Sequence, residues 1–179
     1  SNNLALLQPI GQFGTRAMGG KDSASARYIF TKLNAVTRKI FREDDDVILR
    51  HNNDDGMVVE PKVYYPIIPF VLVNGASGIG TGYSTTIASY NPLDLIVRIR
   101  QYLTQQTMSN LVPWAWGYTG MIVPETEVVD PEFPDGVITK FISRGKIQVD
   151  MNKNCLHVTE LPWGVWTSNY KQYLISLLE

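Results

Sequence analysis

An arginine followed directly by a tyrosine, Arg27-Tyr28, is the pair of residues in this sequence best suited to covalent chemistry. A tyrosine hydroxyl is a weak nucleophile at neutral pH, because its unperturbed pKa is about 10. Attack at phosphorus would need a neighbouring cation or a metal ion to stabilise the developing charge. The planar guanidinium of Arg27 matches a phosphate. The alternative is that Tyr28 packs in a half-buried strand, which is the more common role of such a residue.

The segment before this pair is a glycine-rich loop with two cations. Together with the pair, this motif runs from Gly11 to Tyr28, and ahead of Arg27 it contains Arg16 and Lys21. Backbone N–H groups and cations in such a loop can lie along phosphates. The loop therefore predicts a polyanion site.

A second glycine-rich stretch, residues 71–80, allows two interpretations. Its Gly75, Gly78 and Gly80 resemble the phosphate-binding turn of a dinucleotide enzyme, and Tyr28 and Lys32 form a Tyr-x-x-x-Lys pair. That turn needs a buried strand before it and a helix after it, whereas two prolines precede this stretch and β-branched residues follow it. We expect instead that the glycines allow close approach to another surface. Ile79, between two of them, is either a wedge into stacked bases or a packing residue.

Charge is distributed unevenly along the 179 residues, although the formal net charge is only −1. Residues 1–42 contain seven bases and one acid, Asp22, and residues 43–60 contain seven acids and one base. This pattern excludes a uniformly basic coat and places the polyanion site in the N-terminal quarter. The single Cys155 excludes an intrachain disulfide and a Cys-rich zinc site. We expect His51 to be a surface residue and His157 to pack in a strand.

The elements that must position these residues are mixed α and β. We expect a loop over 9–27, a strand over 28–31, a helix over 33–42 and a hairpin over 47–59 that turns at Asp55-Gly56. Asn91 and Pro92 predict the start of a helix. Strands are expected over 120–123, 137–142, 147–149 and 156–158, and a last helix from 167. A composition change near residue 60 indicates a small basic module, 1–60, joined to a larger α+β module, 61–179.

Several long motifs in order closely resemble the breakage-reunion region of eukaryotic-type DNA topoisomerase II. They occupy residues 8–16, 19–31, 65–69 and 74–82, and weaker likeness continues through 117–120, 160–162 and 166–170. The resemblance implies an α+β fold, with the C-terminal part of a winged-helix domain over 1–60 and part of an α/β tower over 61–179.

By this resemblance, Tyr28 is the nucleophile that attacks a DNA phosphodiester and forms a transient 5′-phosphotyrosyl link. Arg27 acts beside it at the scissile phosphate. The implied DNA contacts are Arg16, Lys21, Gln12, Ser23 and Ser25, and Ile79, flanked by Gly78 and Gly80, is the DNA-bending wedge. No metal ligand is expected in this segment.

The resemblance also implies partners and cofactors. It predicts double-stranded DNA as substrate, a homodimer in the full-length protein, a nuclear location and no membrane contact. Mg²⁺ and ATP would bind in other domains, so we expect a piece of a longer enzyme that is inactive alone. A non-catalytic module that binds and bends duplex DNA remains the alternative, and it would need the basic loop and Ile79 but not Tyr28.

Overall fold

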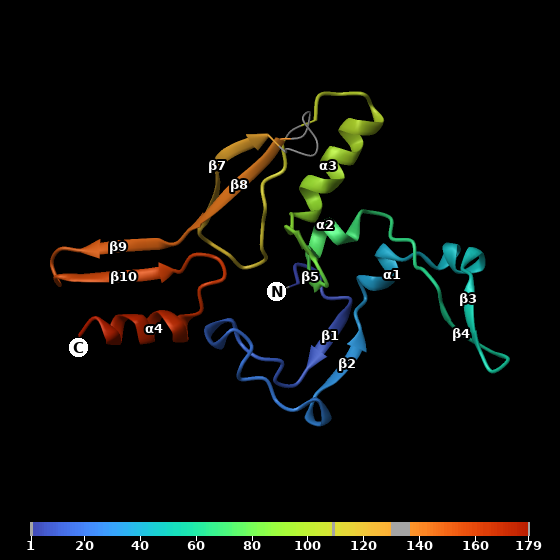
Figure 1. The fold of residues 1–179 in the computed structure, drawn as a ribbon, viewed down its shortest axis with the longest axis horizontal. Coiled ribbons are helices and arrows are strands. Elements are labelled where there is room, and N and C mark those ends of the chain that lie inside the picture. Colours follow the sequence, from blue (N-terminus) through green and yellow to red (C-terminus); the bar gives the residue numbers. More distant parts are fainter. Residues whose placement is uncertain (1, 109, 130–136, 179) are drawn as a thin grey trace. The chain divides into compact units, whose positions relative to one another are not determined.

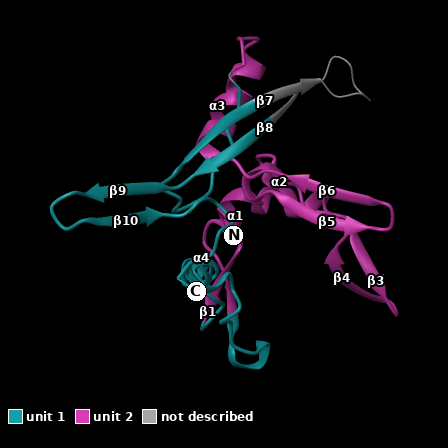
Figure 2. Ribbon diagram, turned by 60° about the vertical axis from the view of Figure 1, so that its left-hand side comes forward, with its two compact units in different colours: residues 1, 11–30, 110–179 teal, residues 2–10, 31–109 magenta. Residues whose placement is uncertain are grey.

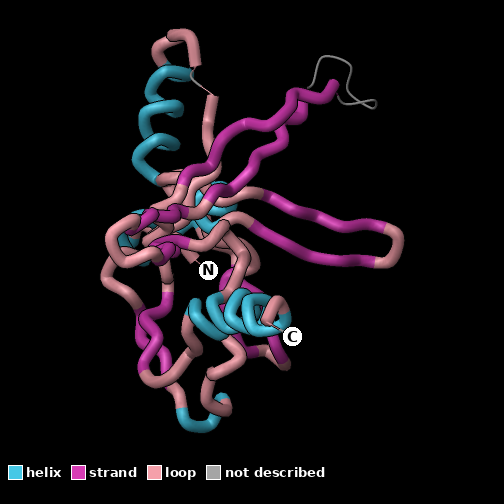
Figure 3. The backbone as a smooth tube through the Cα atoms, turned by 90° about the vertical axis from the view of Figure 1, so that its left-hand side faces the viewer, coloured by secondary structure: helices cyan, strands magenta, loops and turns pink. Residues whose placement is uncertain are grey.

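The computed structural model describes residues 2–108, 110–129 and 137–178 (Figure 1). Within these residues, short strands pair into antiparallel two-stranded ribbons, and helices are few and short (Figure 3). The expected mixed α and β content is confirmed. None of the helices in the described ranges is long and apolar enough to span a bilayer.

The chain forms two compact units (Figure 2). The first joins residues 11–30 to residues 110–179, and the second joins residues 2–10 to residues 31–109. Both units are therefore discontinuous in sequence. This division by contacts does not test the expected domain boundary near residue 60, which stays a prediction.

The second unit is built from three ribbons and three α-helices among its described residues. The ribbons are β1 (Leu7–Ile10) with β2 (Phe30–Leu33), β3 (His51–Asp54) with β4 (Met57–Pro61), and β5 (Ala76–Gly80) with β6 (Tyr83–Ile87); the helices are α1 (Thr37–Ile40), α2 (Phe70–Asn74) and α3 (Pro92–Leu103). Its buried apolar side chains include Ile40, Val73 and Leu95. Val73 is fully buried.

Asparagine side chains anchor this core to the N-terminal segment. The side-chain amide of Asn3 donates to the Val73 carbonyl at 2.8 Å. The Asn74 side chain accepts from the Leu4 amide and donates to the Leu4 carbonyl, each at 2.9 Å. These bonds satisfy backbone groups near the end of α2 and in the N-terminal segment. They fix the end of α2, from which β5 starts.

Local side-chain bonds shorten one predicted helix. The expected helix over 33–42 is wrong in extent, because Leu33 ends β2 and α1 begins only at Thr37. The Asn34 side chain donates to the Ala5 carbonyl at 2.9 Å and accepts from the Val36 amide at 3.2 Å, so the chain turns before the helix can start. The acidic run that follows lies in a 3-10 helix, η3 (Glu43–Ile48).

Other predicted elements are confirmed with small shifts. The β3–β4 hairpin turns at Asp55 and Gly56, with φ of 47° and 86°, the two positive values of a type I′ turn. Helix α3 begins at Pro92, and the Asn91 side chain caps it by accepting from the Leu93 amide at 3.0 Å.

The first unit contains the remaining described ribbons and the last helix. These are β7 (Met121–Val129) with β8 (Val137–Arg144), β9 (Lys146–Asp150) with β10 (Cys155–Glu160), and α4 (Thr167–Ser176). They confirm the four expected strands and the C-terminal helix. Two 3-10 helices, η1 (Arg16–Met18) and η2 (Ala26–Tyr28), interrupt the expected loop. Helix α4 packs against η1, so the basic loop rests on the C-terminal part of the chain.

Gly75 connects α2 to β5 and generates the first prediction. Its φ of 69° and ψ of 178° are accessible essentially to glycine alone, and a Cβ there would lie 2.6 Å from the Ile87 carbonyl oxygen. We expect Gly75→Ala to lower the free energy of unfolding by about 1–3 kcal/mol. The measurement is urea denaturation. Gly78→Ala is the control, because nothing lies within 4 Å of a Cβ at Gly78. An equal loss of unfolding free energy in both variants would contradict the conclusion that the backbone at Gly75 requires glycine.

Candidate active site and nucleic-acid interface

Tyr28 lies at the C-terminal end of η2, outside any strand. Its amide donates to the Ser25 carbonyl at 2.9 Å, and β2 starts only at Phe30. The prediction of a strand over 28–31 is therefore wrong at its start. A strand would have half-buried the ring, whereas Tyr28 is 63% exposed. The hydroxyl is accessible to a large substrate.

Arg27 lies directly against this tyrosine. Its Cζ is 4.9 Å from the centroid of the Tyr28 ring, a cation–π contact. Arg27 is itself exposed, so its guanidinium keeps donors for a further acceptor. The sequence-predicted pair is thus together in space, with a planar cation and a phenol hydroxyl on one exposed turn.

Asp22 closes the glycine-rich loop that precedes the pair. Its carboxylate accepts from the Thr15 amide and the Thr15 hydroxyl, both at 2.8 Å, and from the Gln12 side chain at 3.2 Å. The Thr15 hydrogen bonds hold the pKa of Asp22 below its ordinary value. At Gly14, with φ of 97°, a Cβ would meet the Gly20 backbone at 2.6 Å. The one acid of residues 1–42 thus serves to shape the basic loop.

The predicted DNA contacts in the loop differ in how they are held. Lys21, Ser23 and Ser25 are exposed, and Lys21 forms no ion pair with any of the residues that the structure describes. Gln12 is exposed but engaged with Asp22. Lys21 is the loop cation most available to an anion.

Arg16, by contrast, is tied into the protein. Its guanidinium donates to both oxygens of Glu160, at 2.6 and 3.4 Å, and lies 5.7 Å and 5.5 Å from the ring centroids of Tyr118 and Trp163. The sequence patterns did not predict these three partners of Arg16. They lie more than 100 residues further along, and no local signal connects them to the loop.

Glu160 is the centre of a cluster that also contains Arg16, Tyr118, Thr119 and Trp163, referred to below as the Glu160 cluster. The Glu160 side chain is only 9% exposed, and one oxygen also accepts from the Thr119 amide at 2.9 Å and the Thr119 hydroxyl at 3.0 Å. Burial alone would raise the pKa of Glu160, but the bonds from Thr119 and Arg16 outweigh it and lower the pKa. Burial, with the nearby Glu160 charge, raises the pKa of Tyr118.

Ile79 lies on β5, close to the turn of the β5–β6 hairpin. It pairs with Ser84 and is 93% exposed. A Cβ on Gly78 would meet nothing within 4 Å, and one on Gly80 would meet only the Tyr83 carbonyl at 3.8 Å. The packing alternative for Ile79 is therefore excluded within the described structure. Because the glycines lie on an antiparallel strand followed by another strand, the dinucleotide interpretation is excluded too.

The exposed tyrosine–arginine pair lies on a loop rich in basic residues, an arrangement suited to a polyanion, and sequence comparison gives the family of the chain. The chain belongs to the DNA gyrase/topoisomerase IV A-subunit family, whose model matches residues 1–179. It is 48% identical over 178 residues to DNA topoisomerase 2 of Acanthamoeba polyphaga mimivirus, covering 99% of this chain and 13% of that protein. It is 46% identical over 175 residues to DNA topoisomerase 2 of Saccharomyces cerevisiae, covering 98% of this chain and 11% of that protein.

A solved structure has the same fold. It is the DNA-binding, cleavage and re-ligation domain of Plasmodium falciparum topoisomerase II, with a TM-score of 0.85 and 43% sequence identity, covering 100% of this chain and 23% of that chain. The resemblance inferred from the motifs is confirmed. The chain spans less than a quarter of these relatives.

The Glu160 cluster generates the second prediction. We expect Glu160→Gln to lower the free energy of unfolding at pH 7 by about 1–3 kcal/mol, because it removes a charged acceptor from Arg16 and Thr119. The lowered pKa means that this stabilisation is complete above the ordinary glutamate pKa of about 4.3 and is lost as the pH falls through the folded-state value.

The test is chemical denaturation of both proteins across this acidic range. The difference in unfolding free energy between wild type and Glu160→Gln should become smaller as the pH falls. Glu43→Gln is the control, because the Glu43 side chain is 86% exposed and lies 3.9 Å from Arg38, so little change is expected. A pH-independent difference would contradict the role of the carboxylate charge.

Proposed function

We propose that this chain is the DNA-cleaving segment of a type IIA DNA topoisomerase, an ATP-dependent isomerase. The observation that carries the proposal is the exposed Tyr28 hydroxyl beside Arg27, on a basic loop, in a chain of this family. The names of the relatives and of the solved Plasmodium domain support it.

The proposed reaction is a transesterification. The Tyr28 oxygen bonds to a DNA phosphorus while the bond from that phosphorus to the 3′ oxygen breaks. The phenol proton is lost and the departing oxygen gains one, so the products are a 5′-phosphotyrosyl link and a 3′-hydroxyl. One phosphodiester replaces another, and the bond energy is kept for resealing after strand passage. Arg27 would offset charge on the phosphoryl oxygens.

The loop would hold the DNA backbone around this point. Lys21, Ser23 and Ser25 are exposed and suited to phosphate contacts. Gln12 and Arg16 would act partly through the protein, since Asp22 holds Gln12 and Glu160 holds Arg16. An arginine has five N–H donors, so Arg16 retains donors for a phosphate while it keeps Glu160.

We assign residues 1–60 to the C-terminal part of a winged-helix domain and residues 61–179 to part of a tower domain. The motif resemblance supports this finer assignment, and the Plasmodium DNA-binding, cleavage and re-ligation domain supports the fold over the whole chain. Ile79, at the exposed end of the β5–β6 hairpin, would be the wedge that enters a base step and bends the DNA. The flanking glycines leave room for the duplex.

The residues around Tyr28 do not fit a Mg²⁺ site. Asp22, the one acid within residues 1–42, already accepts hydrogen bonds on both oxygens from Thr15 and Gln12. We therefore assign Mg²⁺, as well as ATP, to other domains of the full-length protein. The same protein would act as a homodimer on double-stranded DNA in the nucleus.

The nucleophile gives the third prediction. In the full-length protein, Tyr28→Phe should abolish cleavage, because it removes only the hydroxyl, and should leave DNA affinity within about twofold, because phosphate contacts supply most of that affinity. The measurement is the covalent protein–DNA adduct trapped by denaturant, with Tyr102→Phe as the control, since Tyr102 is also exposed, on α3.

An adduct that persists in Tyr28→Phe would place the nucleophile elsewhere. If no adduct forms even in the wild-type protein while DNA is bound and bent, the non-catalytic alternative is correct.

The wedge gives the fourth prediction. Ile79→Ala should reduce DNA bending more than it reduces DNA affinity, because the side chain props a base step open while phosphate contacts hold the duplex. Folding stability should change by less than about 0.5 kcal/mol, since the side chain is exposed. Bending is measured by fluorescence transfer between the ends of a short duplex, and stability by a melting curve.

Val47→Ala is the matched control, an exposed apolar residue of η3. Equal bend angles for wild type and Ile79→Ala would eliminate the wedge. A large fall in melting temperature would return Ile79 to a packing role.

A further inference from the structure

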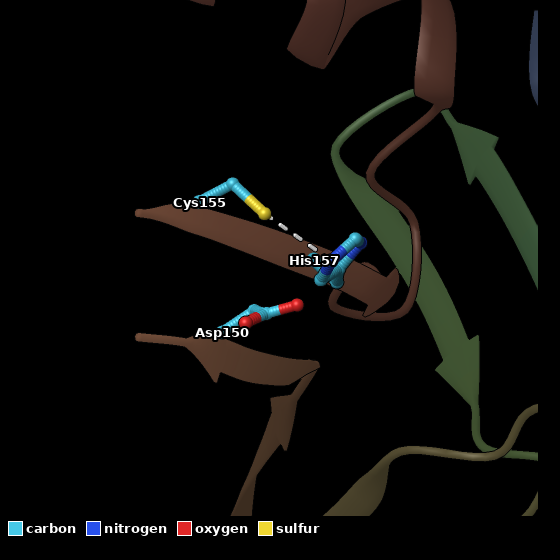
Figure 4. A group of neighbouring side chains, drawn as sticks. All are labelled: Asp150, Cys155 and His157. Atoms are coloured by element: carbon cyan, nitrogen blue, oxygen red, sulfur yellow. Dashed lines mark hydrogen bonds between the residues drawn. The ribbon is translucent and has the colours of Figure 1, made fainter. Parts of the chain in front are cut away.

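The β9–β10 hairpin gathers three side chains of metal-binding type beside its turn. Asp150 ends β9 and pairs directly with Cys155, which begins β10, and His157 follows two residues later. Directly opposite residues, and residues two apart on one strand, share a face of a sheet. Figure 4 shows the carboxylate, the thiol and the imidazole converging on that face. None of the three belongs to the site of the proposed function.

The distances between the three groups fit a common ion. Cys155 Sγ lies 3.3 Å from a ring nitrogen of His157, Nε2, and one ligand atom from each residue falls within 4.8 Å of the others. With Zn–S near 2.3 Å and Zn–N near 2.0–2.1 Å, a tetrahedral zinc ion separates sulfur from nitrogen by about 3.5 Å. The Cys155–His157 pair is therefore already close to the spacing that zinc requires.

The turn orients the carboxylate as a third ligand. Asp150 Oδ1 accepts from the backbone amides of Asn152 and Lys153, at 3.0 and 3.1 Å. These bonds fix the carboxylate and leave Oδ2 for a cation. The Lys153 ammonium lies 4.0 Å from Oδ2, but its side chain is 77% exposed and can swing into solvent.

We propose that Asp150, Cys155 and His157 form a Zn²⁺ site, with water as the fourth ligand. A thiolate and an imidazole favour zinc over Mg²⁺ or Ca²⁺, which prefer oxygen ligands. On binding, the Cys155 thiol releases its proton to solvent and the sulfur bonds to the metal. The prediction that His157 packs in the strand is wrong, because the residue is exposed. One thiolate is compatible with the absence of a Cys-rich site, but the proposed site departs from the expectation that this segment contains no metal ligand.

The site has a structural consequence within its own unit. Strand β10 runs from Cys155 to Glu160, and Glu160 holds Arg16 and Thr119. A bound ion joins the start of β10 to the end of β9 and so restrains the strand that presents Glu160. This role is separate from DNA cleavage, and its test does not depend on that activity.

The test is a titration of the reduced 179-residue chain with Co²⁺, a spectroscopic substitute for zinc. Cobalt bound to a thiolate gives a charge-transfer absorption in the near ultraviolet. Because Cys155 is the one cysteine in the sequence, this band reports on this site alone. We expect one Co²⁺ per chain, displaced by an equivalent of Zn²⁺.

Four variants separate the proposed ligands from their surroundings. Cys155→Ser should abolish the band. His157→Gln and Asp150→Asn should each weaken Co²⁺ binding more than about tenfold, since even outer-shell partners contribute that much. Lys153→Gln should tighten binding, because it removes the cation that competes for Asp150.

His51→Gln is the matched control, because it alters the other histidine of the sequence, whose Nδ1 contacts the Val59 carbonyl oxygen on the β3–β4 hairpin. The Co²⁺ affinity of His51→Gln should equal that of the wild-type chain. Three results would overturn the proposal: no band in the wild-type chain, a band of unchanged affinity in both His157→Gln and Asp150→Asn, or one ion per two chains. The second would mean that the thiolate alone captures cobalt, and the third that the ion bridges two copies.

Discussion

The position of the basic loop depends on one interaction, the ion pair between Arg16 and the largely buried Glu160 carboxylate. The carboxylate receives Arg16 from the loop and Thr119 from the start of the C-terminal half, across 144 and 41 residues of sequence. A carboxylate with so little exposure is costly unless its oxygens are satisfied, and here the guanidinium, an amide and a hydroxyl satisfy them. The aromatic rings of Tyr118 and Trp163 add cation–π contacts to the Arg16 guanidinium.

Hydrogen bonds and ion pairs matter for the stability of this chain because few apolar side chains are buried in the part that the structure describes. Val73, Leu95, Ile40 and Ala115 are buried, whereas many large apolar side chains in the described ranges are exposed. Two-stranded ribbons are marginal alone, because they have too little surface to bury. Hydrogen bonds donated by Asn3, donated and accepted by Asn74, and accepted by Asp22 therefore fix the chain segments that flank the ribbons. The functional side chains stand at the exposed ends of such turns, where a large substrate can reach them.

Sequence patterns predicted those elements whose signals are local. The cap at Asn91, the type I′ turn at Asp55-Gly56 and the strands of the C-terminal half depend on neighbouring residues alone, and each is confirmed. The errors arose where a hydrogen bond, either distant or within a turn, overrode the local propensity for helix or strand. The bond from Asn34 to the Ala5 carbonyl cut short the predicted helix over 33–42, and the 3-10 turn at Ser25 moved Tyr28 out of the predicted strand.

The sequence by itself determined which residues could do chemistry and, through its motifs, the family. Tyr28, Arg27, Lys21 and Ile79 were named from residue type and spacing, which are local and linear properties. Only the tertiary structure decided how each is held: Arg16 bound to Glu160, Lys21 exposed, Ile79 at the end of a hairpin, and Asp150 opposite Cys155. Ion pairs and strand registers join residues that are far apart in the chain. Such contacts depend on the whole packing arrangement and leave no periodic signal in the sequence.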